Sequence, residues 1–166
     1  MSYLATLQCS MCGDLFDPGK VQTFCQKCSQ PLLARYDLEA ARRVLDRDRL
    51  PRERRGMWRW RALLPVQDPR NMIDLGEGDT PLLHLPHIGA ELGLEHVYVK
   101  DESLNPTGSF KARGLAAAVS KAKELGVTRV IIPTAGNAGG AMAAYAARGG
   151  LQAQIFMPKD TPIANI

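Results

Sequence analysis

The chain has 166 residues, of which 45% are hydrophobic and 23% are charged, and its formal net charge is +4. This composition is typical of a folded protein and excludes a chain that stays disordered for lack of apolar residues. No apolar run is long enough for a membrane span, and the N-terminal residues lack the basic and apolar regions of a secretion signal. We therefore expect a cytoplasmic protein.

The first segment, residues 1–31, is short and rich in turns, and it contains all the cysteines in the pattern C-x2-C-x12-C-x2-C. Each C-x2-C pair can present two thiolates to one ion, and four sulfur ligands leave no open position on zinc. Two disulfides or four unrelated buried thiols are the alternatives, which a cytoplasmic location disfavours. We therefore predict a structural zinc ribbon with the ligands Cys9, Cys12, Cys25 and Cys28.

The second segment, residues 32–95, is an arginine-rich helical and irregular connection. The stretch from residue 37 to 50 predicts a helix that Pro51 ends. Ten arginines and five acidic residues lie between residues 35 and 61. Beside a zinc ribbon, with Trp58 and Trp60, they raise the alternative of a nucleic-acid-binding module. Because the acids interleave with the arginines, we favour a solvated helix, with the tryptophans packed on the body of the protein.

The third segment, residues 96–166, alternates between strand-like and helix-like patterns. Strands are predicted at 96–100, 129–133 and 153–158, and helices at 109–126 and 136–150. This alternation predicts an α/β fold with a parallel sheet and right-handed βαβ crossovers. Two crossover helices cannot cover both faces of a three-stranded sheet, so we expect an incomplete three-layer domain and the front part of a longer protein.

Lys111 follows a Pro-Thr-Gly-Ser turn and falls in the first turn of the helix predicted after the first strand. Ligands of parallel sheets bind at the carboxyl ends of strands, where helix N-termini lie. The helix dipole and partial burial disfavour the ammonium form there, which favours a nucleophilic amine that can form a Schiff base. A phosphate-binding lysine and an ordinary surface lysine are the alternatives.

A second junction, "PTAGNAGG" at residues 133–140, occupies the equivalent place one βα unit later. Thr134 and Asn137 offer side-chain hydrogen bonds, and the glycines allow a ligand to approach the backbone. A helix that begins there presents unpaired N–H groups to an anion such as a carboxylate. Two such junctions on neighbouring strands, one of them with a lysine, favour a binding site over two unrelated turns.

Three motifs carry a resemblance to a known family: "LGEGDTPL" at 75–82, "VKDESLNPTGSFKARG" at 99–114 and "TAGNAGG" at 134–140. In order and spacing they resemble the pyridoxal-phosphate enzymes of the tryptophan-synthase-like fold. The four-cysteine ribbon followed by "GMWRWRALLPV" at 56–66 is most similar to the threonine synthases that carry such a ribbon.

The resemblance implies specific roles. Lys111 would form the Schiff base with pyridoxal 5'-phosphate and later move protons, and Asn137 would hydrogen-bond the phenolic oxygen of the cofactor. The α-carboxylate of the substrate would be bound by Thr134, Ala135, Gly136 and Ala138. The implied reaction converts O-phospho-L-homoserine and water to L-threonine and phosphate, with the cofactor as electron sink.

The sequence departs from the family in two ways. Many threonine synthases have aspartate where this chain has Ala112, and alanine there is common in threonine and serine dehydratases of the same superfamily. Cysteate synthase, which shares the ribbon and the fold, is another alternative. The family's loop for the cofactor phosphate would lie beyond residue 166, so we expect this chain to be inactive alone. The expected partner is a small amino-acid substrate, without membrane or nucleic acid, and a homodimer is compatible with a full-length protein.

Overall fold

The computed structural model describes residues 1–52, 55–163 and 166. The N-terminal unit is a three-stranded antiparallel sheet of order β2–β1–β3, formed by β1 (Leu4–Cys9), β2 (Leu15–Phe16) and β3 (Leu32–Tyr36). The cysteine pairs lie at the end of β1 and in the connection between β2 and β3. Since β3 pairs with β1 along its length, this unit extends beyond the boundary predicted at residue 31.

Short helical turns follow the sheet: α1 (Leu38–Val44) and the 3-10 helices η1 (Leu50–Arg52), η2 (Met57–Leu63) and η3 (Pro69–Asn71). The prediction of one helix that continues to Pro51 is wrong, because α1 ends at Val44 and Pro51 lies inside η1. The Asp46 side chain accepts the N–H of Asp48 at 2.8 Å, which forms a turn in place of a further helical turn.

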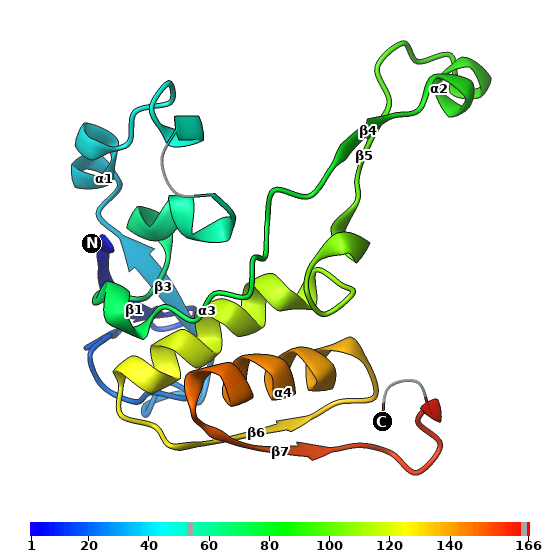
Figure 1. The fold of residues 1–166 in the computed structure, drawn as a ribbon. Helices are drawn as coiled ribbons and strands as arrows, with labels where there is room; N and C mark the ends of the chain where they lie inside the picture. Colours follow the sequence, from blue (N-terminus) through cyan, green and yellow to red (C-terminus); the bar gives the residue numbers. More distant parts are fainter. Residues whose placement is uncertain (53–54, 164–165) are drawn as a thin grey trace.

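A hairpin arm extends from the body of the molecule (Figure 1). It consists of β4 (Leu82–His84), α2 (Pro86–Leu92) and β5 (Tyr98–Lys100), and β4 and β5 pair antiparallel. The strand predicted at 96–100 exists, but its predicted place in a parallel sheet with the next two strands is wrong. β5 pairs with β4 in the hairpin arm instead, and all three of its residues are exposed.

The C-terminal part is a βαβ unit of β6 (Arg129–Pro133), α4 (Asn137–Gly149) and β7 (Gln152–Phe156), whose strands pair in parallel as predicted. It is preceded by the 3-10 helix η4 (Glu102–Leu104) and by α3 (Lys111–Glu124). Figure 1 shows α3 and α4 packed side by side and running in the same direction. The fold is therefore a mixed α/β structure with small sheets.

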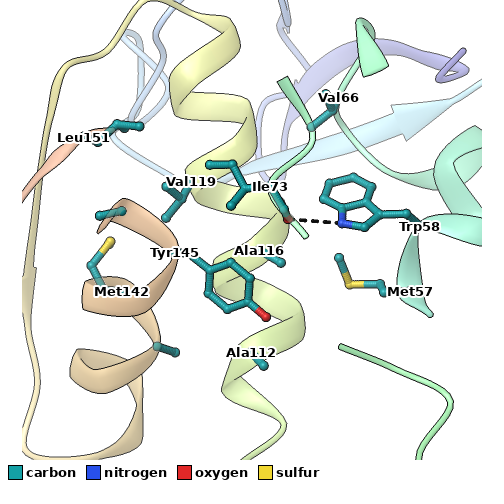
Figure 2. Close-up of a cluster of buried hydrophobic side chains, with 12 residues drawn as sticks. Met57, Trp58, Val66, Ile73, Ala112, Ala116, Val119, Met142, Tyr145 and Leu151 are labelled. Atoms are coloured by element: carbon teal, nitrogen blue, oxygen red, sulfur yellow. Dashed lines mark hydrogen bonds between the residues drawn. The ribbon is translucent and has the colours of Figure 1, made fainter. Parts of the chain in front are cut away.

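One apolar cluster joins the arginine-rich segment to the two long helices (Figure 2). Trp58 is fully buried, and its Nε1 donates to the carbonyl oxygen of Ile73 at 3.2 Å. The N–H of Ile73 in turn donates to the hydroxyl of Ser120 on α3 at 2.8 Å. Trp58 is thus a core residue, as favoured above, whereas Trp60 is 46% exposed. In the described part of the chain, no helix is long and apolar enough to cross a membrane.

Candidate functional site

The four cysteines of the N-terminal unit form one cluster, in which the sulfur atoms all lie within 4.8 Å of one another. The Sγ atoms of Cys9 and Cys28 are 3.4 Å apart, those of Cys12 and Cys25 are 3.6 Å apart, and the four thiols are free. Four sulfurs around one zinc ion at about 2.3 Å would be separated by about 3.8 Å. The cluster therefore fits a tetrahedral metal ion with no open position.

Backbone N–H groups favour the thiolate form of one cysteine of this cluster, Cys9. Burial alone would raise the pKa of Cys9, but the N–H groups of Cys12 and Met11, each 3.4 Å from Sγ, lower this pKa to about 6 together with Cys28. The thiolate form is the one that binds metals. The neighbouring Cys9 thiol raises the pKa of Cys28. A hydrogen bond from the Asp14 backbone lowers the pKa of Cys12, but burial and the neighbouring thiols outweigh it and raise this pKa to about 12. It is therefore the set of four sulfur donors that suits a soft cation, and this set leaves no vacant position for catalysis.

Lys111 is the first residue of α3 and is partly buried. Its Nζ lies 4.2 Å from the centroid of the Phe110 ring, and its N–H donates to the Ser109 hydroxyl at 3.3 Å. The preceding turn is closed by the N–H of Gly108, which donates to the carbonyl oxygen of Asn105 at 2.8 Å. Gly108 has a φ of +67°, a conformation that glycine adopts without strain. The turn therefore places Lys111 in the first turn of the helix, as the sequence predicts.

The second predicted junction begins α4. Asn137 is the first helical residue, and its side chain is exposed. Thr134 is anchored by its N–H, which donates to the carbonyl oxygen of Phe156 at 2.9 Å, and its hydroxyl accepts the N–H of Gly136 at 3.3 Å. The predicted substrate residues therefore lie on either side of Asn137 at the helix start: Thr134, Ala135, Gly136 and Ala138.

Two glycines at this junction have different functions. A Cβ on Gly139 would lie 2.8 Å from Met157 Cε and 3.1 Å from Ile155 Cγ2, so this glycine allows α4 to pack on β7. A Cβ on Gly140 would meet nothing within 4 Å. Gly139 thus has a packing role where the sequence suggested access for a ligand, and Gly140 faces open space.

The starts of α3 and α4 lie at the same end of the molecule, which is also where the chain leaves β6 and β7 (Figure 1). The N-cap residue of neither helix forms a side-chain cap hydrogen bond. The first N–H groups of α3 nevertheless have acceptors in the preceding turn: Lys111 donates to the Ser109 hydroxyl, Ala112 to the Ser109 carbonyl oxygen and Arg113 to the Phe110 carbonyl oxygen. By contrast, α1, η3 and η4 are each capped by an aspartate: Asp37, Asp68 and Asp101. An uncapped first turn leaves N–H groups without helical acceptors, and such groups bind anions, so the start that suits an anion is that of α4. We treat the two predicted junctions together as the candidate site, in which the start of α4 suits an anionic ligand and Lys111 provides an amine.

Glu102 received no role in the sequence analysis, yet the structure places its side chain in a hydrogen-bond network. Its carboxylate accepts two hydrogen bonds from Arg113, at 2.5 and 2.7 Å, and one from the Thr80 hydroxyl at 2.5 Å. The hydrogen bonds from Arg113 lower the pKa of Glu102 to about 2 despite the opposing effect of burial. The sequence signal for this pair is an acid before the lysine turn, Glu102, and an arginine after it, Arg113.

The comparison with protein families decides the relationship. A model described as "Pyridoxal-phosphate dependent enzyme" matches residues 73–166. The chain belongs to this family. The match includes both junctions and the turn that carries Lys111, and the family's name states the cofactor, pyridoxal phosphate.

Curated relatives within this family are threonine synthases. The protein of Methanocaldococcus jannaschii is 37% identical over 152 residues, which are 92% of this chain and 37% of that protein. The protein of Methanosarcina acetivorans is 36% identical over 152 residues, which are 92% of this chain and 36% of that protein. The Synechocystis protein is 47% identical over 108 residues, which are 60% of this chain and 28% of that protein. The chain thus spans little more than a third of the relatives that it matches over most of its own length.

The candidate site fits pyridoxal phosphate in its donor set. The cofactor needs an amine for its aldehyde carbon and donors for its oxygen atoms. Lys111 provides an amine, Asn137 provides a side-chain amide, and the start of α4 provides backbone N–H groups. The hydroxyl oxygen of Thr107, in the turn before Lys111, is buried and has no hydrogen-bond partner among the described residues. A further polar group is thus available beside the lysine.

Proposed function

We propose that the chain provides the lysine-bearing part of a threonine synthase, which converts O-phospho-L-homoserine and water to L-threonine and phosphate. The observation that carries the proposal is that Lys111 and Asn137 begin two adjacent, parallel helices at one end of the fold. The names of the relatives from three organisms support the reaction.

In this proposal each residue has a defined task. Lys111 would hold the cofactor through its Nζ, and as a free amine it would move protons at the α- and β-carbons of the substrate. Asn137 would hold the phenolic oxygen of the cofactor through its side-chain amide. The backbone between Thr134 and Ala138 binds the α-carboxylate at the start of α4. When bound, pyridoxal phosphate supplies an electron sink for the bonds at the α-carbon.

The cysteine cluster has a structural task in the same proposal. A zinc ion bound by Cys9, Cys12, Cys25 and Cys28 would connect β1 to the loop between β2 and β3, both outside the candidate site. Apolar side chains are exposed in this unit, among them Met11, Leu15, Val21 and Phe24. A small unit with few buried side chains depends on its metal for folding.

A hybrid protein tests the reaction. This chain replaces the segment that it matches in the Methanocaldococcus jannaschii threonine synthase, and phosphate release from O-phospho-L-homoserine is measured together with threonine formation. We expect both products in equal amounts, and we expect no measurable turnover in the Lys111→Ala hybrid. As a control, Lys20→Ala changes an exposed lysine of the N-terminal unit and leaves the rate unchanged. A folded hybrid that binds the cofactor but dehydrates serine or threonine, and forms no threonine, would refute the assigned reaction.

A further inference from the structure

The turn that carries Lys111 is held at both of its ends by one carboxylate. At the near end, the Nδ2 of Asn105 donates to the Oε2 of Glu102 at 3.0 Å and to its carbonyl oxygen at 2.9 Å. At the far end, Arg113, two residues beyond the lysine, forms a two-pronged pair with the same carboxylate. Because both ends bind Glu102, the position of this carboxylate sets the position of the turn between them.

The same carboxylate also connects the turn to a second loop, residues 75–80. The Thr80 hydroxyl donates to Oε1 of Glu102 at 2.5 Å, and the N–H of Gly78 donates to Oδ1 of Asn105 at 3.0 Å. Thr80 and Asn105 are 6% and 4% exposed. Buried polar groups of this kind hold one geometry, because each lost hydrogen bond leaves an unpaired group without water.

The second loop is itself fixed to α4, the helix that begins at Asn137. Glu77 is fully buried, and its Oε2 accepts the Tyr145 hydroxyl of α4 at 2.7 Å. The connection from Tyr145 through the loop to Glu102 therefore links the two helices whose starts form the candidate site. Packing between α3 and α4 is the second link between them.

We propose that Glu102, together with Asn105 and Arg113, is a positioning residue that holds the amine of Lys111 at the cofactor site. This inference rests on the proposed role of Lys111. Glu102 contacts neither cofactor nor substrate in this proposal, and it acts through the turn. Its side chain is 23% exposed and that of Arg113 is 33% exposed, so the pair is partly shielded from water and salt.

Reductive trapping tests the inference on the hybrid protein described above, because the hybrid also contains the part of the relative that is expected to bind the cofactor phosphate. In this experiment, "wild type" denotes the hybrid without a further substitution. The amine adds to the aldehyde carbon of pyridoxal phosphate and expels water to give a C=N bond. Borohydride then transfers hydride to that carbon, and water supplies the proton to nitrogen, which leaves a stable secondary amine. Peptide mapping by mass spectrometry gives the initial labelling rate of Lys111 relative to that of Lys20, an exposed lysine of the N-terminal unit.

We expect this ratio to be well above one in the wild type and to fall about tenfold in Glu102→Gln, because a small displacement of a reacting group has a large effect on rate. Asp101→Asn is the matched control, since it removes one negative charge at the neighbouring residue, which bonds to Ser103 and lies outside the network. The ratio should change less than twofold in this control. General loosening of the fold would raise the labelling of many lysines, whereas loss of position lowers that of Lys111 alone.

The outcomes separate the two claims. A selective wild type with an equally selective Glu102→Gln variant overturns the positioning role and leaves the proposed function standing. A wild type that labels Lys111 no faster than Lys20 overturns both. If Glu102→Gln does not fold, Arg113→Lys serves in its place, because it keeps the charge and removes the two-pronged geometry. A decrease of at least threefold in Arg113→Lys then supports the inference, and an unchanged ratio refutes it.

Discussion

Replacing Tyr145 by phenylalanine tests how loop 75–80 is held against α4. Tyr145 is fully buried, and its hydroxyl donates to Glu77 at 2.7 Å. Burial, followed by the neighbouring Glu77, raises the pKa of Tyr145 well above its ordinary value, so the hydroxyl keeps its proton. The N–H of Leu75 also donates to Oε2 of that carboxylate, at 3.0 Å, and Oε1 has no hydrogen-bond partner among the described residues.

Hydrogen bonds to charged groups contribute about 1.5–3 kcal/mol, and the loss is greatest where the acceptor stays buried. We therefore expect Tyr145→Phe to lower the free energy of unfolding by about 2–3 kcal/mol. For a chain of this size the corresponding decrease in Tm is about 6–9 °C. Thermal and urea unfolding followed by circular dichroism measure both quantities.

Tyr98→Phe is the control for this substitution. Tyr98 is 50% exposed and stacks on His84, and the phenyl ring retains that contact. The control should change stability by less than about 0.5 kcal/mol. Equal melting temperatures for the two variants would refute the account of the buried Glu77–Tyr145 pair.

Three further predictions concern the glycine loop, the ion pair and the metal. Gly78→Ala should destabilise the chain by several kcal/mol, because the added Cβ would lie 2.6 Å from the Met57 nitrogen. Gly76 has a similar φ but open space around it, so Gly76→Ala should cost only about 1 kcal/mol. Equal urea midpoints for the two variants would contradict this prediction. The pKa of Glu102 is lowered from 4.5 to about 2, so its stabilising effect is complete above about pH 4.5 and is lost as the pH falls toward 2. The difference in urea midpoint between wild type and Glu102→Gln should therefore shrink over that range, and a constant difference would be the contrary result. Cys25→Ser should lose most of the bound zinc and unfold at a lower temperature, whereas the control Ser10→Ala should do neither. Metal analysis and thermal unfolding measure the two effects. Full zinc content in the cysteine variant would argue against a four-sulfur site.

Local patterns predicted the elements on which the candidate site is built. β6 has the predicted bounds, and α3 and α4 end near Gly126 and Gly150, which have positive φ values. The same residues that terminate helices in isolation terminate them here, because glycine adopts the left-handed conformation without strain. Family resemblance gave the roles of Lys111 and Asn137, and these roles remain predictions.

Long-range contacts could not be predicted in the same way. β5 has a strand-like sequence, but its partner is β4, and nothing within the strand specifies that pairing. Glu102 bonds to residues that lie 22 positions before it and 11 positions after it. A charged residue at a strand end is usually solvated, so only the folded arrangement shows this one to be part of a network.

A crystal structure of the hybrid protein grown with pyridoxal phosphate tests the central claim most directly. We expect continuous electron density from the Nζ of Lys111 to the aldehyde carbon of the cofactor. We also expect the amide of Asn137 within about 3.2 Å of the phenolic oxygen. Cofactor bound to a different lysine, or to Lys111 with Asn137 turned away from it, would contradict the claim that the two helix starts form one site.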